Sequence, residues 1–158
     1  MNHPLLNRLE LLIPPPLVAL ALGLLMSLIV PFIPHPAQLP FHHLILCALV
    51  ACAGVLCAVL GVYCFWRHHT TINPHRPDKT SALVTSGIYR FTRNPMYVGI
   101  LLVLAGWALY LSHILPLLLV PLFMLYLNRF QISPEEQVLE KRFGTDFTSY
   151  RDSVRRWL

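Results

Sequence analysis

The residues best suited to chemistry lie in a short polar segment directly ahead of a long apolar run. Residues 87–99 read GIYRFTRNPMYVG and concentrate arginine, asparagine and tyrosine between Tyr89 and Tyr97. Guanidinium groups bind carboxylates and phosphates, and tyrosine rings pack against cations. Alternatively, arginine and tyrosine only anchor a helix end at the lipid headgroups, and Asn94-Pro95 starts that helix. Composition alone leaves both interpretations open, and the density of hydrogen-bonding groups favours a site.

A pair of carboxylates is the second candidate. Glu135 and Glu136 follow directly on the last long apolar run. The sequence Ser-Pro-Glu-Glu is typical of a helix start, with Ser133 as N-cap and Glu136 completing a capping box. Such a cap is a sufficient structural reason for the acids, which also suit the positive end of a helix dipole. If the last two apolar helices form a hairpin, however, the pair lies near Arg93 and can bind a cationic group.

Cysteine and histidine do not predict a metal site. The four cysteines, at positions 47, 52, 57 and 64, share one apolar run and match no zinc spacing, so we interpret them as packing residues. His68, His69 and His75 lie in an irregular polar stretch without a cysteine or carboxylate placed beside them. Because the chain lacks G-x-G-x-x-G and P-loop motifs, any nucleotide-containing cofactor would bind outside a Rossmann fold.

The elements that position these residues are apolar helices. Hydrophobic residues make up 56% of the 158-residue chain and charged residues 12%, against about 25% charged in soluble domains. Together with a mean hydropathy of +0.59, this composition predicts an integral membrane protein of the all-α class. Four segments are long and apolar enough to be helices, at about 12–33, 41–66, 96–111 and 114–130.

We expect a single domain of two parts. Residues 1–66 form two N-terminal transmembrane helices, and the N-terminus shows no cleavable signal peptide. Residues 67–158 form a polar loop, a tight helical hairpin turning at Ser112-His113, and an amphipathic C-terminal helix at the membrane surface.

Charge distribution predicts the orientation. The 67–93 stretch and the tail from Ser133 each carry five Lys or Arg, whereas the turns at 34–40 and 112–113 carry none. The positive-inside rule therefore places both termini and the polar loop in the cytoplasm, with a bacterial inner membrane as the expected location. The same rule explains the net charge of +5 without a nucleic-acid partner, and no obligate protein partner is indicated.

Two separate motifs carry a resemblance. The segments LVTSGIYRFTRNPMYVG, 83–99, and EEQVLEKRFGTDFTSY, 135–150, resemble the isoprenylcysteine carboxyl methyltransferase family, within a wider group that includes phospholipid methyltransferases. The resemblance covers residues 67–158, and the first two helices match only in being hydrophobic. It implies a multispan membrane enzyme that uses S-adenosylmethionine and releases S-adenosylhomocysteine. The cofactor would lie between the loop, the hairpin and the C-terminal helix.

The resemblance also implies residue roles. Catalytic roles fall to Arg93, Glu135, Glu136 and Arg142. Cofactor contacts fall to Leu83, Val84, Gly87, Tyr89, Asn94, Pro95, Tyr97 and Glu136. The family usually carries histidine where this chain has Asn94, and asparagine cannot exchange protons near neutral pH. An acid–base role at that position is therefore not expected here.

The expected function is S-adenosylmethionine-dependent methylation of a lipophilic, membrane-embedded acceptor at the cytosolic interface. An isoprenylcysteine-like carboxylate and a lipid amine both remain open as acceptors. The short chain favours a small bacterial relative over a true prenyl-protein enzyme. Two other classes remain as alternatives, a NADPH-dependent sterol-type reductase and a non-catalytic membrane subunit. The reductase would need more clustered cations to bind the phosphates of its dinucleotide.

Overall fold

The computed structural model describes residues 10–32, 41–68 and 82–158, and within them every regular element is a helix. In chain order these are α2 (Pro15–Ile29), η1 (Val30–Phe32), α3 (Phe41–Arg67), η3 (Gly87–Arg90), α4 (Pro95–Leu111), α5 (Ile114–Leu127), η4 (Asn128–Ile132), α6 (Ser133–Phe143) and α7 (Thr145–Ser153). The predicted all-α class is confirmed. Much of the polar stretch before η3, including His69 and His75, lies outside the described residues.

The apolar helices lie where the sequence predicted them. Within the described residues, three helical stretches are long and apolar enough to cross a membrane, namely Pro15–Phe32, Phe41–Arg67 and Ile114–Phe143. The fourth apolar helix, α4, has 17 residues and extends about 25 Å. Large apolar side chains point outward along these helices, as for Leu20, Leu49 and Leu118. In a bilayer these side chains contact lipid, and the chain is a membrane protein.

The predicted hairpin between α4 and α5 is confirmed. Ser112 adopts the left-handed conformation (φ 52°), and its N–H donates to the carbonyl of Leu109. Its hydroxyl donates to the same carbonyl over 2.9 Å. The turn therefore reverses the chain with few residues and keeps its polar groups satisfied at the membrane boundary.

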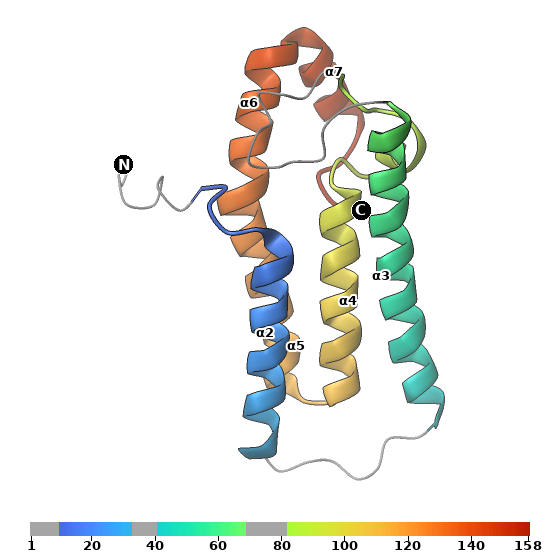
Figure 1. Ribbon diagram of the computed structural model, residues 1–158, viewed down its shortest axis with the longest axis vertical. Coiled ribbons are helices and arrows are strands. Elements are labelled where there is room, and N and C mark those ends of the chain that lie inside the picture. Colours follow the sequence, from blue (N-terminus) through green and yellow to red (C-terminus); the bar gives the residue numbers. More distant parts are fainter. Residues whose placement is uncertain (1–9, 33–40, 69–81) are drawn as a thin grey trace.

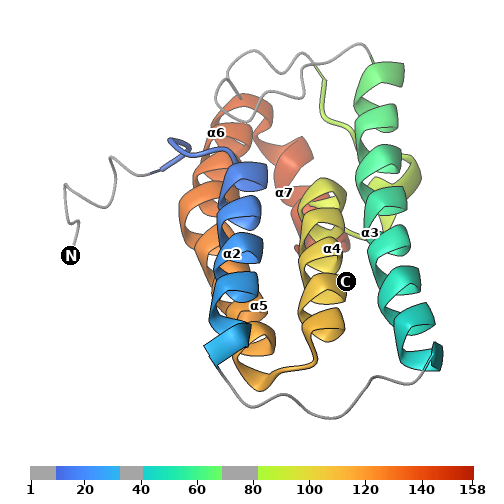
Figure 2. The same ribbon diagram turned by 60° about the horizontal axis from the view of Figure 1, so that its bottom comes forward.

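Helix α4 is the centre of the bundle, and α2, α3 and α5 all pack on it (Figures 1 and 2). Glycines bring α3 and α4 into backbone contact. A methyl group built on Gly99 would lie 2.6 Å from the carbonyl oxygen of Gly54 and 2.7 Å from the nitrogen of Ala58. Because lipid tails are as apolar as helix side chains, such close backbone packing is what holds membrane helices together.

The predicted N-cap at Ser133 is wrong. Ser133 is itself helical (φ −62°, ψ −43°), and α5 continues through the π-helical turn η4 into α6 (Figure 1). Its N–H and its hydroxyl both donate to the carbonyl of Asn128, the latter over 2.7 Å. Proline at 134 has no N–H to donate, and a π turn just before it accommodates that missing bond. The glutamates therefore project from a continuous helix, and Glu136 caps nothing.

The chain ends in two helices in place of the one expected. Gly144, at φ +52°, separates α6 from α7, and the glycine tolerates this conformation because it has no Cβ. Helix α6 extends the line of α5, whereas α7 turns back over the end of α4 (Figure 1). This return places the last residues of the chain next to the segment at 92–94.

Replacing Gly99 by alanine tests the α3–α4 contact. Alanine raises helix propensity by about 1 kcal/mol, but its methyl group would overlap backbone of α3, and overpacking of this kind costs about 1–3 kcal/mol. We expect G99A to unfold at a lower temperature in detergent, as followed by circular dichroism. G23A is the matched control, because a methyl group there meets its nearest atoms at 3.9 Å. Equal unfolding temperatures for the two variants would contradict the close contact.

Candidate functional site

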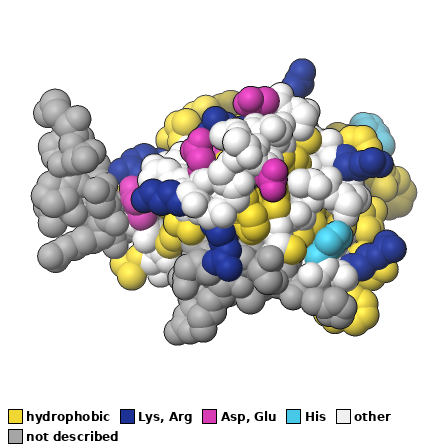
Figure 3. All heavy atoms as spheres, turned by 90° about the horizontal axis from the view of Figure 1, so that it is seen from above, with side chains coloured by type: hydrophobic (Ala, Val, Ile, Leu, Met, Phe, Trp, Pro, Cys, Tyr) yellow, Lys and Arg dark blue, Asp and Glu magenta, His cyan; other side chains and the backbone are white. Residues whose placement is uncertain are grey.

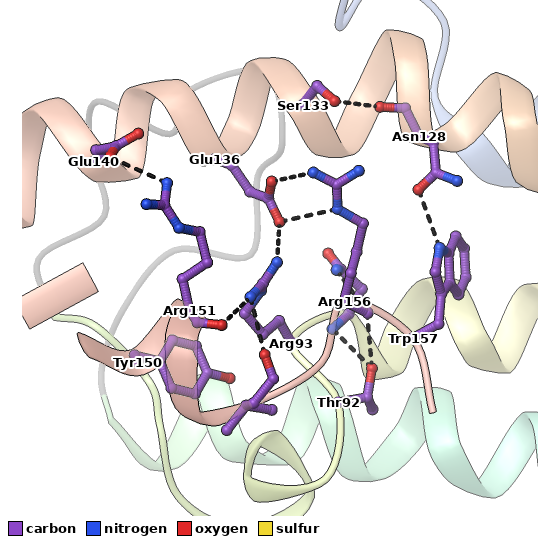
Figure 4. A network of polar contacts seen from close by, with 12 residues as sticks. Thr92, Arg93, Asn128, Ser133, Glu136, Glu140, Tyr150, Arg151, Arg156 and Trp157 are labelled. Carbon is purple, nitrogen blue, oxygen red and sulfur yellow. Dashed lines mark hydrogen bonds and ion pairs between the residues drawn. The ribbon is translucent and has the colours of Figure 1, made fainter. Parts of the chain in front are cut away.

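The two sequence motifs meet beside the N-terminal end of α4. Arg93 lies between η3 and α4, and its Nη2 is 2.8 Å from Oε1 of Glu136 on α6. The side chains are only 10% and 15% exposed, so little water screens their charges. The predicted approach of the acids to Arg93 is confirmed for Glu136, and Figure 4 shows the contact.

Arg93 also fastens the chain end that follows α7. Its Nη1 donates to the carbonyls of Arg151 (2.6 Å) and Val154 (2.9 Å), and its backbone N–H donates to the carbonyl of Arg155 (3.0 Å). Its Nε is buried and has no hydrogen-bond partner within the described part of the chain. The protein therefore occupies three of the five N–H donors of this guanidinium.

A second guanidinium binds the same carboxylate. Nε of Arg156 donates to Oε1 of Glu136 over 3.2 Å, and its Nη2 forms a short contact with Oε2 (Figure 4). The backbone carbonyl of Arg156 accepts from the hydroxyl of Thr92 (3.1 Å) and from the amide of Asn94 (2.9 Å). Asn94 thus serves as a hydrogen-bond donor that holds the end of the chain.

Sequence reasoning missed Arg156 and Trp157 as parts of this network. The indole Nε1 of Trp157 donates to Oδ1 of Asn128, in the π turn η4, over 3.0 Å. The sequence predicts for the tail that contains them only an amphipathic helix at the membrane surface. The two consecutive arginines near the end of the chain were the signal that could have suggested a partner for the glutamates. The spacing between these arginines and the glutamates does not show, however, that α7 turns back toward α4.

Glu135 has a different environment from its neighbour. Its Oε1 accepts a hydrogen bond of 2.5 Å from the hydroxyl of Tyr97, a buried residue in the first turn of α4. No cation lies within ion-pair distance of Glu135 in the described residues, whereas Glu136 contacts two. The two glutamates are therefore distinguished by their partners: one carboxylate is occupied by protein cations and the other is not.

Four of the predicted cofactor contacts, at positions 83, 84, 87 and 89, lie on the segment that leads into and includes η3. Val84 and Tyr89 are buried against Cys64 at the end of α3, and the rings of Tyr89 and Phe65 meet edge to face at 5.4 Å. Gly87 has φ +62°, and a methyl group on it would lie 2.7 Å from the sulfur of Cys64. The side chains of Val84 and Tyr89 thus face the protein interior.

Hydrogen bonds hold this segment to α7 and to the end of α3. Tyr150 of α7 donates to the carbonyl of Tyr89 over 2.7 Å. Burial raises the pKa of both tyrosines, so both hydroxyls stay protonated. On the α3 side, Nδ1 of His68 donates to the carbonyl of Cys64 (2.8 Å), and its Nε2 lies 3.3 Å from the hydroxyl of Ser86.

The remaining predicted residues separate into two groups. Leu83 is partly buried, and Pro95 is buried as the first residue of α4. Arg142 is exposed and lies over the ring of Phe143 at 6.0 Å, away from the Glu136 contacts. The structure therefore does not bring Arg142 into the network.

No group of three metal-ligating side chains occurs within residues 10–32, 41–68 and 82–158.

Viewed from this end, the molecule presents acidic and basic side chains among polar and apolar ones (Figure 3). The opposite turn, at Ser112-His113, carries neither Lys nor Arg. The bundle is therefore electrically asymmetric along its axis, with the charged network and the ends of α3 and α6 together.

Known proteins resemble parts of this chain. Residues 42–146 match the model of a family described as phospholipid methyltransferase. An uncharacterized protein of Haemophilus influenzae is 46% identical over 63 residues, which are 40% of this chain and all of that protein. The protein-S-isoprenylcysteine O-methyltransferase of Schizosaccharomyces pombe is 34% identical over 77 residues, 49% of this chain and 33% of that protein. The chain thus spans about a third of the yeast protein, and no solved structure matches it.

Replacing Glu136 by glutamine tests the network. The change leaves two guanidinium groups without their shared counter-charge, and breaking a buried pair in this way costs about 3 kcal/mol. We expect E136Q to lower the free energy of unfolding by about that amount in denaturant titrations in detergent. E140Q is the matched control on the same helix, because Glu140 and its partner Arg151 are 43% and 38% exposed. Loss of so exposed a pair costs less than about 1 kcal/mol. Equal effects of the two changes would contradict the network.

Proposed function

This chain belongs to the phospholipid methyltransferase family, and we propose that it transfers a methyl group from S-adenosylmethionine to a lipophilic acceptor in the bilayer. The observation that carries the proposal is the extent of the family match. Residues 42–146 include both Arg93 and Glu136, the two positions that form an ion pair across the site. A membrane methyltransferase needs such a site where lipid and water-soluble material meet.

The residues present fit the cofactor at Glu135. A partly buried carboxylate with a tyrosine hydroxyl as its partner is suited to a cation, because a charge removed from water needs a counter-charge. The amino group of the cofactor is such a cation. Glu135 would hold this group, and Tyr97 would orient the carboxylate. The two arginines on Glu136 favour a positioning role for that residue.

The segment before α4 would form the adenosine side. Leu83 is partly buried, and Gly87 presents exposed backbone. Val84 and Tyr89 would support this wall from behind, because their side chains pack on α3. Asn94 and Pro95 would shape its lower edge at the start of α4.

The cofactor, when bound, supplies a methyl group activated by a sulfonium charge. The protein contributes orientation and exclusion of water, which together account for much of the rate in such reactions. Asn94 does not exchange protons, so the site suits an acceptor that already is a nucleophile. A carboxylate meets this condition, and the guanidinium of Arg93 would supply a positive charge close to it. An amine acceptor would instead need a base, for which an oxygen of Glu135 is the candidate.

An apolar groove suits the hydrocarbon part of the acceptor. Between α2, α3 and α4 the structure has a hollow of about 930 Å³ whose lining includes Gly23, Ala51, Val55, Gly99 and Trp107. Its upper lining residue on α4, Gly99, lies about 7.5 Å along the helix from Asn94. A lipid with its polar group at the charged network could extend its chain along this groove.

We also propose that the charged end faces the cytoplasm of a bacterial inner membrane, following the positive-inside rule.

Ligand binding and transfer test this function. S-adenosylmethionine and S-adenosylhomocysteine should raise the unfolding temperature of the purified protein in detergent, because a ligand of the folded state stabilises it by RT ln(1 + [L]/Kd). NADPH should not raise it. Methyl-labelled S-adenosylmethionine should then label N-acetyl-S-farnesylcysteine as a base-labile ester. Stabilisation by NADPH alone would support a reductase, stabilisation by none would support a non-catalytic subunit, and base-stable label in lipid extracts would point to an amine.

Replacing Glu135 by glutamine tests the cofactor contact. Loss of a charge-assisted hydrogen bond costs about 1.5–3 kcal/mol, so S-adenosylhomocysteine should bind about 10 to 100 times more weakly in calorimetric titrations. E140Q again serves as the control and should bind as the wild type does. Unchanged affinity in E135Q would remove this residue from the cofactor site.

A further inference from the structure

The last residues of the chain are built into the site. The segment Val154–Trp157, called here the C-terminal strap, crosses beside the start of α4 and lies beyond the family match, which ends at residue 146. Its backbone carbonyls accept bonds from all three residues at 92–94. Thr92 and Asn94 donate to Arg156, whereas Arg93 donates to the two residues before it.

The side chain of Arg156 fixes the orientation of Glu136. Arg93 reaches only Oε1 of that carboxylate, while Arg156 contacts both oxygens through Nε and Nη2. A planar guanidinium that contacts both oxygens defines the plane of a carboxylate as well as its position. Without Arg156, Oε2 loses its partner and the carboxylate is free to rotate about the contact with Arg93.

The strap is anchored at its far end as well. Trp157 packs against the core of the bundle, and its Nε1 donates to Asn128 in the π turn η4. The strap therefore connects the α5–α6 junction to the start of α4. Arg155 lies in the same segment but has an exposed side chain, and it contributes only its backbone carbonyl.

We propose that Arg156 is a positioning residue for methyl transfer, acting through Glu136 to hold Arg93 at the acceptor side of the site. This inference rests on the proposed function. Because Arg156 does not contact Glu135, its effect should fall on the acceptor and not on cofactor affinity.

Three variants test it in the full-length protein in detergent, namely R156Q, R156K and the matched control R155Q. R156Q should lower kcat/KM for methylation of N-acetyl-S-farnesylcysteine at least tenfold, with an unchanged Kd for S-adenosylhomocysteine. R156K keeps the positive charge but not the planar guanidinium that contacts both oxygens of Glu136, so it should recover part of the lost kcat/KM. R155Q should match the wild type, because its backbone contact remains.

Hydrogen exchange supplies a readout that does not need turnover. The peptide that covers residues 92–97 should exchange faster in R156Q than in R155Q. The backbone N–H of Arg93 donates to the strap at Arg155, and the N–H of Asn94 donates to the hydroxyl of Thr92, which itself donates to the strap. Equal exchange in the two variants would overturn the inference whatever the enzyme does. Wild-type turnover in R156Q, joint loss of cofactor binding and turnover, or no recovery in R156K would overturn it too. If the wild type neither binds S-adenosylhomocysteine nor transfers methyl, the proposed function fails. The hydrogen-exchange comparison then still shows whether Arg156 holds residues 92–97 in place.

Discussion

One carboxylate, that of Glu136, holds the charged end of this molecule together. Three segments far apart in the chain meet there, because Arg93 and Arg156 both donate to it. Removing these charges from water costs free energy. The attraction between them offsets that cost only where the geometry is good and the remaining hydrogen-bond donors have partners. The carbonyls of Arg151 and Val154, at the end of α7, supply partners for Nη1 of Arg93. The folded arrangement of loop, helix and strap therefore depends on a contact that no single segment can make.

The bundle below supplies the rigid base for that contact. In lipid the hydrophobic effect does not drive helices together, so backbone proximity and polar links must do so. Gly54 and Gly99 allow the backbones of α3 and α4 to approach closely. Trp107 of α4 forms a polar link to α2, because its Nε1 donates to the carbonyl of Gly23 (3.3 Å) and to the hydroxyl of Ser27 (3.2 Å). With α2 and α3 both fixed to α4, the start of α4 is held in a defined place for the network.

Much of the fold followed from local patterns. Apolar runs predicted the helices to within a few residues, and the polar pair Ser112-His113 predicted the hairpin. The same kind of pattern failed at Ser133, because a cap signature describes an isolated helix start. Here η4 lets the helix continue through Pro134, and the serine hydroxyl bonds to the preceding turn instead. The prediction that Arg93 approaches the acids held because the hairpin alone suffices to bring them together.

The sequence by itself determined the class of the protein, since hydropathy and helix length depend on composition along short windows. It also predicted that Arg93 and the two glutamates come to the same end, because a hairpin returns the chain to the side from which it entered. Only the tertiary structure decided that Glu136 is bound by two arginines while Glu135 faces Tyr97. Adjacent glutamates on a helix differ by about 100° in direction, so the rotation of α6 against α4 selects between them. That rotation is set by side-chain packing across the whole bundle, and no local pattern encodes it.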